Sequence, residues 1–521
     1  MLPPLLISLP TGLTIGGVQV WAARLTSELA ARGHTTALLL HPEESAPLDI
    51  PLHPALQVFR LPSHPISDIP HPTFAPLRAS RGDLSPYLPT YRHAITTLNQ
   101  QTQQPVICIP QHLGDSAGLF AALTRDIPDQ FRIAGWCQLD SPYDLRVLDF
   151  YSPVIAHIAA VSDHLEHTLR ARIPHARIWN IPNATPIDAS NPPRPRLNTA
   201  RPRLLYLGRL DRDIKRVLAL PTLSRTLTQL GLRHTLTIIG NGPARDDLAR
   251  ACAGLDTIIL RDAATPGEVP ALLDDHDIFI LPSRAEGLSL ALLEALSRGC
   301  VPFITHTESG AAQVINSSNG VLVPTPTTAD EHAAGEDLAR AIAANLHRLP
   351  HLSRAAIASI TSSRYTLAAQ ADAAEAFLRA AASEPPLIWP QDRNPSFTAP
   401  SPHGSGCTPP DAEHHLRALL DSLAHRTLLI HGVGNHTTEL LHIYQEHAHH
   451  IAAFTDDNPA AHNTTLLNRP VIAPLDAHTT GATDVIISSW LHQGAIHARR
   501  ATYEAQGLAV HRIYDNIASV L

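Results

Sequence analysis

The chain has 521 residues, of which 44% are hydrophobic and 17% are charged, and its formal net charge is -8. This length predicts about three domains, at roughly 150 residues for each. The net negative charge gives no electrostatic reason to expect a nucleic-acid partner, and the longest apolar runs are too short to span a bilayer.

The first run of the sequence, MLPPLLISLPTGL, is apolar like a signal peptide but has no basic n-region and leads directly into a Gly-rich turn. We therefore interpret it as a first buried strand. The five cysteines are scattered without a C-x-x-C spacing. This pattern indicates a reducing compartment and argues against a disulfide framework or a zinc ribbon, so we expect a cytoplasmic protein.

Strand-like apolar runs alternate with helical patterns, which predicts α/β domains with parallel sheets. Residues 1–190 form the first predicted domain, with a helix at 18–32. Its strands are expected at 4–9, 36–40, 56–60, 105–109, 131–136, 157–161 and 177–181. Residues 42–90, rich in Pro, His and Ser, are expected to form an irregular excursion on the acceptor side. A Pro-rich break at 190–202 ends this domain.

The second predicted domain, residues 200–383, contains two glutamates in a suggestive position. The run EGLSLALLEALSRG follows a strand, so Glu286 and Gly287 lie ahead of a helix and Glu294 lies two turns along it. Free N–H groups at a helix start suit an anionic diphosphate, and carboxylates accept hydrogen bonds from sugar and ribose hydroxyls. Taken alone, two glutamates at this spacing are better explained as ordinary carboxylates on a helix surface.

Two cations precede them in the run LLYLGRLDRDIKR. Arg209 comes directly after a strand, and Lys215, six residues later, is the single lysine of the chain. Because a compact ammonium differs from a guanidinium as a phosphate ligand, we expect a functional role for Lys215. Together the two cations could clamp a diphosphate and neutralise a leaving nucleotide. The acids Asp211 and Asp213 have a D-x-D spacing, which we interpret as loop acids, and we expect no metal requirement.

The end of the chain is predicted to hold a Pro-rich linker, residues 384–411, and a third, small Rossmann-like domain, residues 412–521. In that domain Gly432 and Gly434 lie between a strand and a helix, and Asp456 ends the next strand, where a ribose-binding acid would lie. The third glycine of the dinucleotide fingerprint is missing. Two interpretations stay open: a second nucleotide site, or a degenerate Rossmann unit that serves packing or assembly.

The motifs G-R-(x)5-K, IIGNGP, LPSRAEGLSLALLEALSRG and GVLVP together resemble the GT-B retaining glycosyltransferases of family 4 (glycosyl transferases group 1), over about residues 1–380. The resemblance implies two tandem Rossmann-like domains and sugar transfer from a UDP- or GDP-sugar to a glycan, lipid-linked or small-molecule acceptor, with no required cofactor. Similarly, GVGN and FTDDN in the last domain resemble the Rossmann-like domain of sugar O-acyltransferases. Peripheral association with the inner face of a membrane would fit a lipid-linked acceptor.

The resemblance also assigns roles to residues. It implies that Arg209 and Lys215 bind the donor diphosphate, that Glu286 binds hydroxyls of the transferred sugar, and that Glu294 binds the ribose. The donor loop would be completed by Gly287, Leu288 and Ser289, with backbone N–H groups from Gly16 and Gly17 on the other domain. Transfer would need no side-chain nucleophile, so catalysis would consist of positioning and leaving-group stabilisation.

The sequence departs from the family at two points. The family carries a His near the sugar, for which His112 is the candidate here, with a satisfied loop histidine as the alternative, while Gln138 stands where such a His could be expected. The Asn-Gly turn after the domain junction is Asn183-Ala184, which lacks a residue with easy access to positive φ. Two alternatives to a transferase stay open: a nucleotide-sugar-modifying enzyme of the epimerase type, and a non-catalytic sugar-nucleotide-binding subunit.

Overall fold

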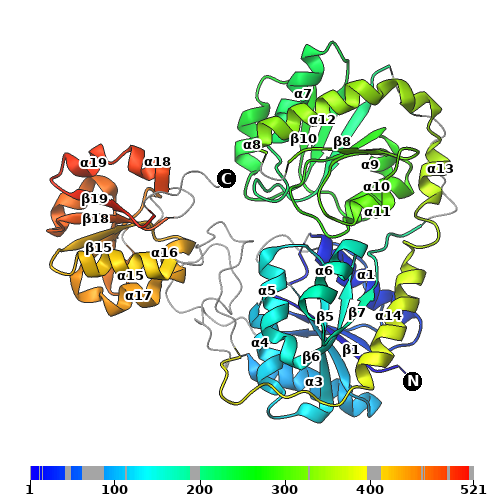
Figure 1. The fold of residues 1–521 in the computed structure, drawn as a ribbon, viewed down its shortest axis with the longest axis horizontal. Coiled ribbons are helices and arrows are strands. Elements are labelled where there is room, and N and C mark those ends of the chain that lie inside the picture. Colours follow the sequence, from blue (N-terminus) through cyan, green and yellow to red (C-terminus); the bar gives the residue numbers. More distant parts are fainter. Residues whose placement is uncertain are drawn as a thin grey trace. The chain divides into compact units, whose positions relative to one another are not determined.

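The computed structural model describes the chain except residues 1, 11, 15, 42–47, 62–86, 112–113, 188–196, 198–199, 327–328, 396–411, 459–460, 463, 490–492 and 515–521. The described residues up to 395 belong to one compact unit, and those from 412 onward belong to a second one (Figure 1). The excursion expected at 42–90 lies largely outside the described residues. Among the described helices, none is both long enough and apolar enough to cross a membrane.

The first Rossmann domain is a seven-stranded parallel sheet in the order β3-β2-β1-β4-β5-β6-β7. Its strands are β1 (Leu5–Leu9), β2 (Thr36–Leu40), β3 (Gln57–Arg60), β4 (Val106–Pro110), β5 (Phe131–Cys137), β6 (Ile155–Ala160) and β7 (Arg177–Asn180). Its helices are α1 (Gly17–Ala31), α3 (Leu88–Thr102), α4 (Gly114–Leu123), α5 (Pro142–Tyr151) and α6 (Asp163–Arg172). All seven predicted strands are confirmed. Central strands such as β1 are buried along their whole length, because helices cover both faces of the sheet.

The second Rossmann domain is a six-stranded parallel sheet in the order β10-β9-β8-β11-β12-β13. Its strands are β8 (Arg203–Leu207), β9 (Thr235–Ile239), β10 (Ile258–Arg261), β11 (Ile278–Leu281), β12 (Val301–Thr305) and β13 (Val321–Val323). Its helices are α7 (Ala219–Gln229), α8 (Arg245–Cys252), α9 (Val269–Asp274), α10 (Leu290–Ser297), α11 (Ala311–Val314), α12 (Glu331–Asn345) and α13 (Arg354–Ser359). The predicted architecture of two tandem Rossmann-like domains is confirmed.

Helix α14 (Leu367–Ala382) does not pack on the second domain, to which the predicted boundaries 200–383 assign it. It returns to the first domain, where it contacts α1 and strands β4 to β6 (Figure 1). Its buried Phe377 packs edge-on against Trp136, with ring centroids 5.6 Å apart, and its Glu375 pairs at 3.2 Å with Arg32, the C-terminal cap of α1. Helical periodicity shows that one face of a segment is apolar, but it does not show which domain covers that face.

The first part of the predicted linker, residues 384–395, is a packed segment rather than a spacer. Trp389 is completely buried, 5.3 Å from the rings of Phe150 and Tyr151. The Arg125 guanidinium donates to the Arg393 carbonyl at 2.7 Å and also to the carbonyls of residues 389 and 390. The linker prediction is therefore wrong for residues 384–395, because one large aromatic side chain anchors an irregular segment that has no periodicity of its own.

We expect Trp389→Ala to lower the free energy of unfolding of the first unit by about 3–5 kcal/mol, the usual cost of emptying an aromatic core position. The measurement is the midpoint and slope of urea unfolding. Leu387→Ala, in the same segment but 36% exposed, is the matched control and should cost less than about 1 kcal/mol. Equal losses in the two variants would show that the segment is not anchored by Trp389.

The tail domain, residues 412–521, has cores of its own and a six-stranded sheet in the order β16-β17-β15-β14-β18-β19. Its strands are β14 (Leu428–His431), β15 (Ile451–Thr455), β16 (Thr465–Leu466), β17 (Arg469–Ile472), β18 (Asp484–Ile487) and β19 (Ala509–Arg512). Its helices are α15 (Ala412–Ser422), α16 (Asn435–Glu439), α17 (Leu441–Glu446), α18 (Gln493–Ala498) and α19 (Ala501–Glu504). The predicted Rossmann-like character is confirmed, and the antiparallel β16–β17 hairpin is an addition.

Candidate functional site

The predicted site residues of the second domain gather at one edge of its sheet. Strands β8 and β11 are parallel neighbours, so the loops that leave their carboxyl ends lie side by side. The first loop carries Arg209 and Lys215, and the second carries Glu286. Residues far apart in sequence are thereby brought to one place by sheet order.

Lys215 and Glu286 form a direct ion pair. The Lys215 Nζ lies 2.5 Å from Glu286 Oε1, and the Ser283 hydroxyl donates to the same oxygen at 2.6 Å. Glu286 is only 7% exposed, yet its Oε2 makes no hydrogen bond to any described residue. The site therefore presents the Lys215 ammonium, fixed by its ion pair, beside the Glu286 Oε2, which is open to a ligand hydroxyl.

A buried arginine that was not among the predicted site residues joins the two loops. Arg216 has no exposed surface, and its guanidinium donates to the carbonyls of Pro282 at 2.8 Å and Ser283 at 3.0 Å. Its φ of 46° is uncommon for a residue other than glycine. Burial lowers the pKa of Arg216 to about 10, so it stays charged at neutral pH. Arg216 thus fixes the spacing between the Lys215 turn and the Glu286 loop.

Arg209 lies at the same edge but is held loosely. Its side chain is 53% exposed, and its nearest described acid is Asp211, at 3.7 Å. The buried Tyr206 hydroxyl donates to the Arg209 carbonyl at 2.7 Å, and burial raises the pKa of Tyr206 well above its usual value. Asp211 Oδ1 accepts the Ile214 N–H at 2.9 Å, which supports its interpretation as a loop acid. The Arg209 guanidinium is therefore free to turn toward an anion.

The loop that precedes α10 is held by the first domain and by its own cap. A Cβ on Gly287 would lie 2.0 Å from the Gln138 carbonyl oxygen, so the backbone of the first domain approaches this glycine closely. The Leu288 carbonyl accepts the Asn183 side-chain amide at 2.8 Å. Ser289 caps α10 by accepting the N–H three residues on. The loop is rigid where the two domains meet.

On the first domain, Gly16 and Gly17 open α1. Gly16 is extended (φ -179°) and is crowded by the Gln19 side chain, whereas no described atom lies within 4 Å of a Cβ placed on Gly17. The predicted His112 lies outside the described residues. At the neighbouring strand end, the Gln138 Nε2 is buried without a hydrogen-bond partner among the described residues. Gln138 thus offers an unpaired amide N–H group just after the carboxyl end of β5.

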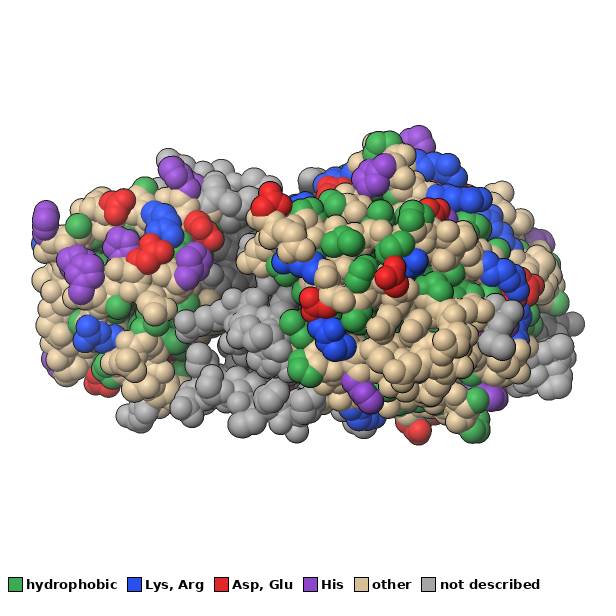
Figure 2. Space-filling model, turned by 90° about the horizontal axis from the view of Figure 1, so that it is seen from below, with side chains coloured by type: hydrophobic (Ala, Val, Ile, Leu, Met, Phe, Trp, Pro, Cys, Tyr) green, Lys and Arg blue, Asp and Glu red, His purple; other side chains and the backbone are tan. Residues whose placement is uncertain are grey.

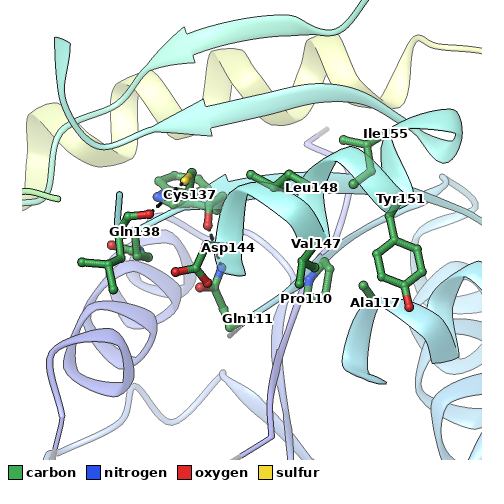
Figure 3. Close-up of a pocket in the computed structure, with 13 residues that line it drawn as sticks. Pro110, Gln111, Ala117, Cys137, Gln138, Asp144, Val147, Leu148, Tyr151 and Ile155 are labelled. Carbon is green, nitrogen blue, oxygen red and sulfur yellow. Dashed lines mark hydrogen bonds between the residues drawn. The ribbon is translucent and has the colours of Figure 1, made fainter. Parts of the chain in front are cut away.

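A pocket opens beside Gln138 at the carboxyl ends of β4 and β5 (Figure 3). Its lining is largely apolar with three polar side chains, and comprises Pro110, Gln111, Ala117, Gly135, Trp136, Cys137, Gln138, Leu139, Asp144, Val147, Leu148, Tyr151 and Ile155. Burial raises the pKa of the Cys137 thiol far above its usual value, so this thiol stays protonated. No local sequence pattern marks this pocket, because its walls come from three strands, two helices and the loops between them.

In the tail domain, the residues of the predicted nucleotide motif hydrogen-bond within their own loops. Gly432 has a φ of 108°, which only glycine adopts easily, while Gly434 precedes α16 in an extended conformation. Both oxygens of Asp456 accept backbone N–H groups, from Val433 at 2.9 Å and from Asn458 at 2.8 Å. The acid predicted to bind ribose thus shapes the loop, and a second nucleotide site remains a prediction.

No group of three or more His, Cys, Asp or Glu side chains that could hold a metal ion occurs in the described part of the chain. Figure 2 shows histidines spread over the face of the molecule in that view, among charged side chains of both signs. Their abundance therefore gives no positive indication of a metal centre.

Sequence similarity to known proteins concerns the second domain, and structural similarity concerns the fold of the first unit. Residues 201–346 match the family model described as glycosyl transferases group 1. The alpha-D-kanosaminyltransferase of Streptomyces kanamyceticus is 31% identical over 137 residues, which are 25% of this chain and 35% of that enzyme. The chain thus covers about a third of the length of this relative.

Among solved structures, sucrose-phosphate synthase from Thermosynechococcus elongatus superposes with a TM-score of 0.56 at 18% identity, over 73% of this chain and 98% of that one. The pneumococcal O-GlcNAc transferase GtfA, in complex with UDP and GlcNAc, superposes with a TM-score of 0.55 at 12% identity, over 74% of this chain and all of that one. At these identities the likeness shows the fold. The chain therefore carries a glycosyl transferases group 1 segment, residues 201–346, within a GT-B fold.

Proposed function

We propose that the protein is a retaining glycosyltransferase of family 4 that transfers a hexose from a nucleotide-sugar donor to a hydroxyl of a glycan, a lipid-linked saccharide or a small molecule. The observation that carries this proposal is the Lys215–Glu286 pair, joined at 2.5 Å at the carboxyl edge of the second sheet. The group 1 segment and the GT-B fold support it.

In this proposal the donor diphosphate binds Lys215 and the loosely held Arg209. The open oxygen of Glu286 accepts a hydroxyl of the transferred sugar, and Glu294 on α10 accepts a ribose hydroxyl. The uncrowded backbone at Gly17, with Gly16 before it, leaves room for the phosphate–sugar region of the donor. Both cations favour the charge that develops on the departing diphosphate.

The chemical step of this proposal is a retaining transfer. The acceptor oxygen forms a bond to the anomeric carbon on the face from which the diphosphate departs. The bond from that carbon to the diphosphate breaks, and the acceptor proton passes to the leaving phosphate oxygen. Side chains of the protein position the reactants and stabilise the leaving group, so no nucleophilic side chain is consumed.

A screen of UDP-, GDP- and ADP-sugars tests the proposal, with thermal shift for binding and nucleotide release for turnover. UDP-sugars come first, because UDP is bound by the structural neighbour GtfA. We expect slow nucleotide release without an acceptor. Conversion of a donor without nucleotide release would favour the epimerase alternative, and binding without any turnover would favour a non-catalytic subunit. The absence of both binding and turnover with every donor would refute the proposal.

Transfer is expected to be independent of divalent metal. Asp211 bonds the Ile214 N–H and lies near Arg209, so the carboxylate that a D-x-D metal site would use is engaged within its own loop. Turnover should be the same in EDTA as in EDTA with excess magnesium. A loss of turnover in EDTA that manganese restores would contradict this expectation.

The acceptor is proposed to approach from the first domain, where the pocket beside Gln138 offers apolar walls with a polar rim. A lipid-linked acceptor would bring the protein to the inner face of a membrane as a peripheral protein. The tail domain is proposed either to bind a second nucleotide near Gly432 or to serve assembly, with the loop role of Asp456 favouring the second option.

A further inference from the structure

The second glutamate of the site is held from the opposite domain. Glu294 Oε1 lies 2.8 Å from the Arg24 Nη1 of α1, and the two side chains are 13% and 10% exposed. Within the described residues, Arg24 is the only polar side chain in contact with this carboxylate. The pair joins the first and second Rossmann domains at the candidate donor site.

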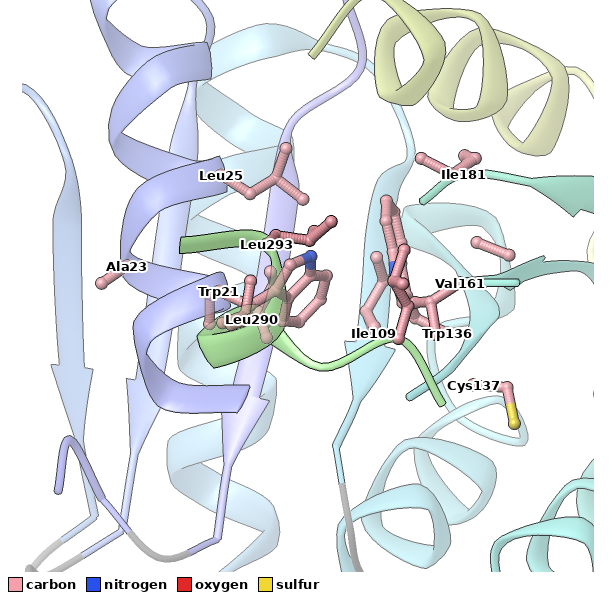
Figure 4. Packing of buried hydrophobic residues seen from close by; sticks show 14 of the residues in the cluster. Trp21, Ala23, Leu25, Ile109, Trp136, Cys137, Val161, Ile181, Leu290 and Leu293 are labelled. Atoms are coloured by element: carbon pink, nitrogen blue, oxygen red, sulfur yellow. The ribbon is translucent and has the colours of Figure 1, made fainter. Parts of the chain in front are cut away.

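The surroundings of this pair are apolar. Trp21, one turn before Arg24, lies against Trp136 with ring centroids 4.9 Å apart, and Leu290 and Leu293 of α10 pack beside them (Figure 4). Trp21 is 1% exposed and Trp136 is 4% exposed. Because both side chains are largely buried, removal of one partner would leave the other charge unpaired in a poorly hydrated place.

The contact leaves part of the carboxylate available. The 2.8 Å contact with Arg24 is made by Oε1 of Glu294, and a carboxylate can accept about four hydrogen bonds over its two oxygens. A ribose hydroxyl can therefore bind Glu294 while the guanidinium remains in place. The ion pair with the guanidinium limits the orientations of the carboxylate, which favours the bond from the hydroxyl.

We propose that Arg24 is a positioning residue of the donor site, which orients Glu294 and makes nucleotide affinity depend on the contact between the two domains. This inference rests on the proposed function, since it assumes that Glu294 binds the nucleotide. Arg24 acts through Glu294 and has no direct role at the reacting atoms. Replacing it should therefore lower nucleotide affinity more than the rate of the chemical step.

The test is a double-mutant cycle on the full chain, with UDP, GDP and ADP titrated by calorimetry. Arg24→Ala should weaken the affinity for the best-bound nucleotide by about tenfold, which lies within the range of coupled interactions. It should also raise the donor KM, with a smaller change in kcat. In a Glu294→Ala background the same substitution should change affinity less than about twofold. Arg24→Lys, which keeps the charge, should restore part of the affinity.

Arg32→Ala is the matched control, because Arg32 lies at the C-terminal cap of the same helix and pairs with Glu375 of α14 instead of a residue of α10. It should leave nucleotide affinity unchanged. If Arg24→Ala does not fold, Arg24→Gln, which keeps much of the side-chain stem, takes its place in the cycle. An equal loss of nucleotide affinity on replacing Arg24 with and without Glu294 would overturn this inference alone. Tighter nucleotide binding after the replacement of Arg24 would do the same. Failure of the unaltered protein to bind any of the three nucleotides would instead overturn the proposed function.

Discussion

Replacing Lys215 with alanine is expected to reduce sugar transfer by about 10²–10³-fold, the usual effect of removing one group that stabilises developing charge. The variant loses the ammonium that lies 2.5 Å from Glu286 and faces the proposed diphosphate position. Lys215→Arg should recover only a small part of the activity, because a planar guanidinium does not occupy the same point as a compact ammonium. The measurement is kcat and KM with the donor identified by the screen.

The same substitution should also lower stability, since it leaves the 7%-exposed Glu286 carboxylate without its cation. Adding Glu286→Gln should restore the melting temperature without restoring transfer, which separates the fold from the chemistry. Arg250→Ala, which removes a 73%-exposed cation of the same domain, is the control and should change neither quantity. Full transfer by Lys215→Ala would remove this residue from the proposed site.

Gly287→Ala is expected to lower transfer by about 10²-fold or more, because a shift of about 1 Å in a reacting geometry has an effect of that size. The added Cβ would lie 2.0 Å from the Gln138 carbonyl oxygen and 3.0 Å from the Val161 side chain. Since the nearer of these atoms is backbone, the two domains must separate at this point. The reduction should therefore appear in kcat as well as in KM, while the second domain stays folded.

Gly267→Ala is the control for this variant, because a Cβ there meets no described atom within 4 Å. It should leave both transfer and melting temperature close to those of the unaltered protein. Undiminished transfer by Gly287→Ala would mean that the two domains do not touch at Gly287 in the active conformation, and the role assigned to this contact would be wrong.

Most strands of the three domains were predictable because they are short apolar runs bounded by turn residues, and such runs occur where both faces of a sheet are covered. The β16–β17 hairpin was not predicted. Its two-residue turn is Leu467–Asn468, both at positive φ, in place of the Asn-Gly or Asp-Gly pair that usually marks such a turn. Likewise, the junction at Asn183 needs no glycine, since neither it nor Ala184 is among the residues at positive φ.

By itself, the sequence determined the alternation of strands and helices, and with it the placement of Arg209, Lys215 and Glu286 in loops that follow strands. Local patterns suffice for this, because periodicity and loop position are properties of neighbouring residues. Only the tertiary structure decided that α14 and the segment around Trp389 pack on the first domain, that Arg216 joins the two site loops, and that Arg24 holds Glu294. These are contacts between distant residues, and no local pattern records which buried partner a side chain will find.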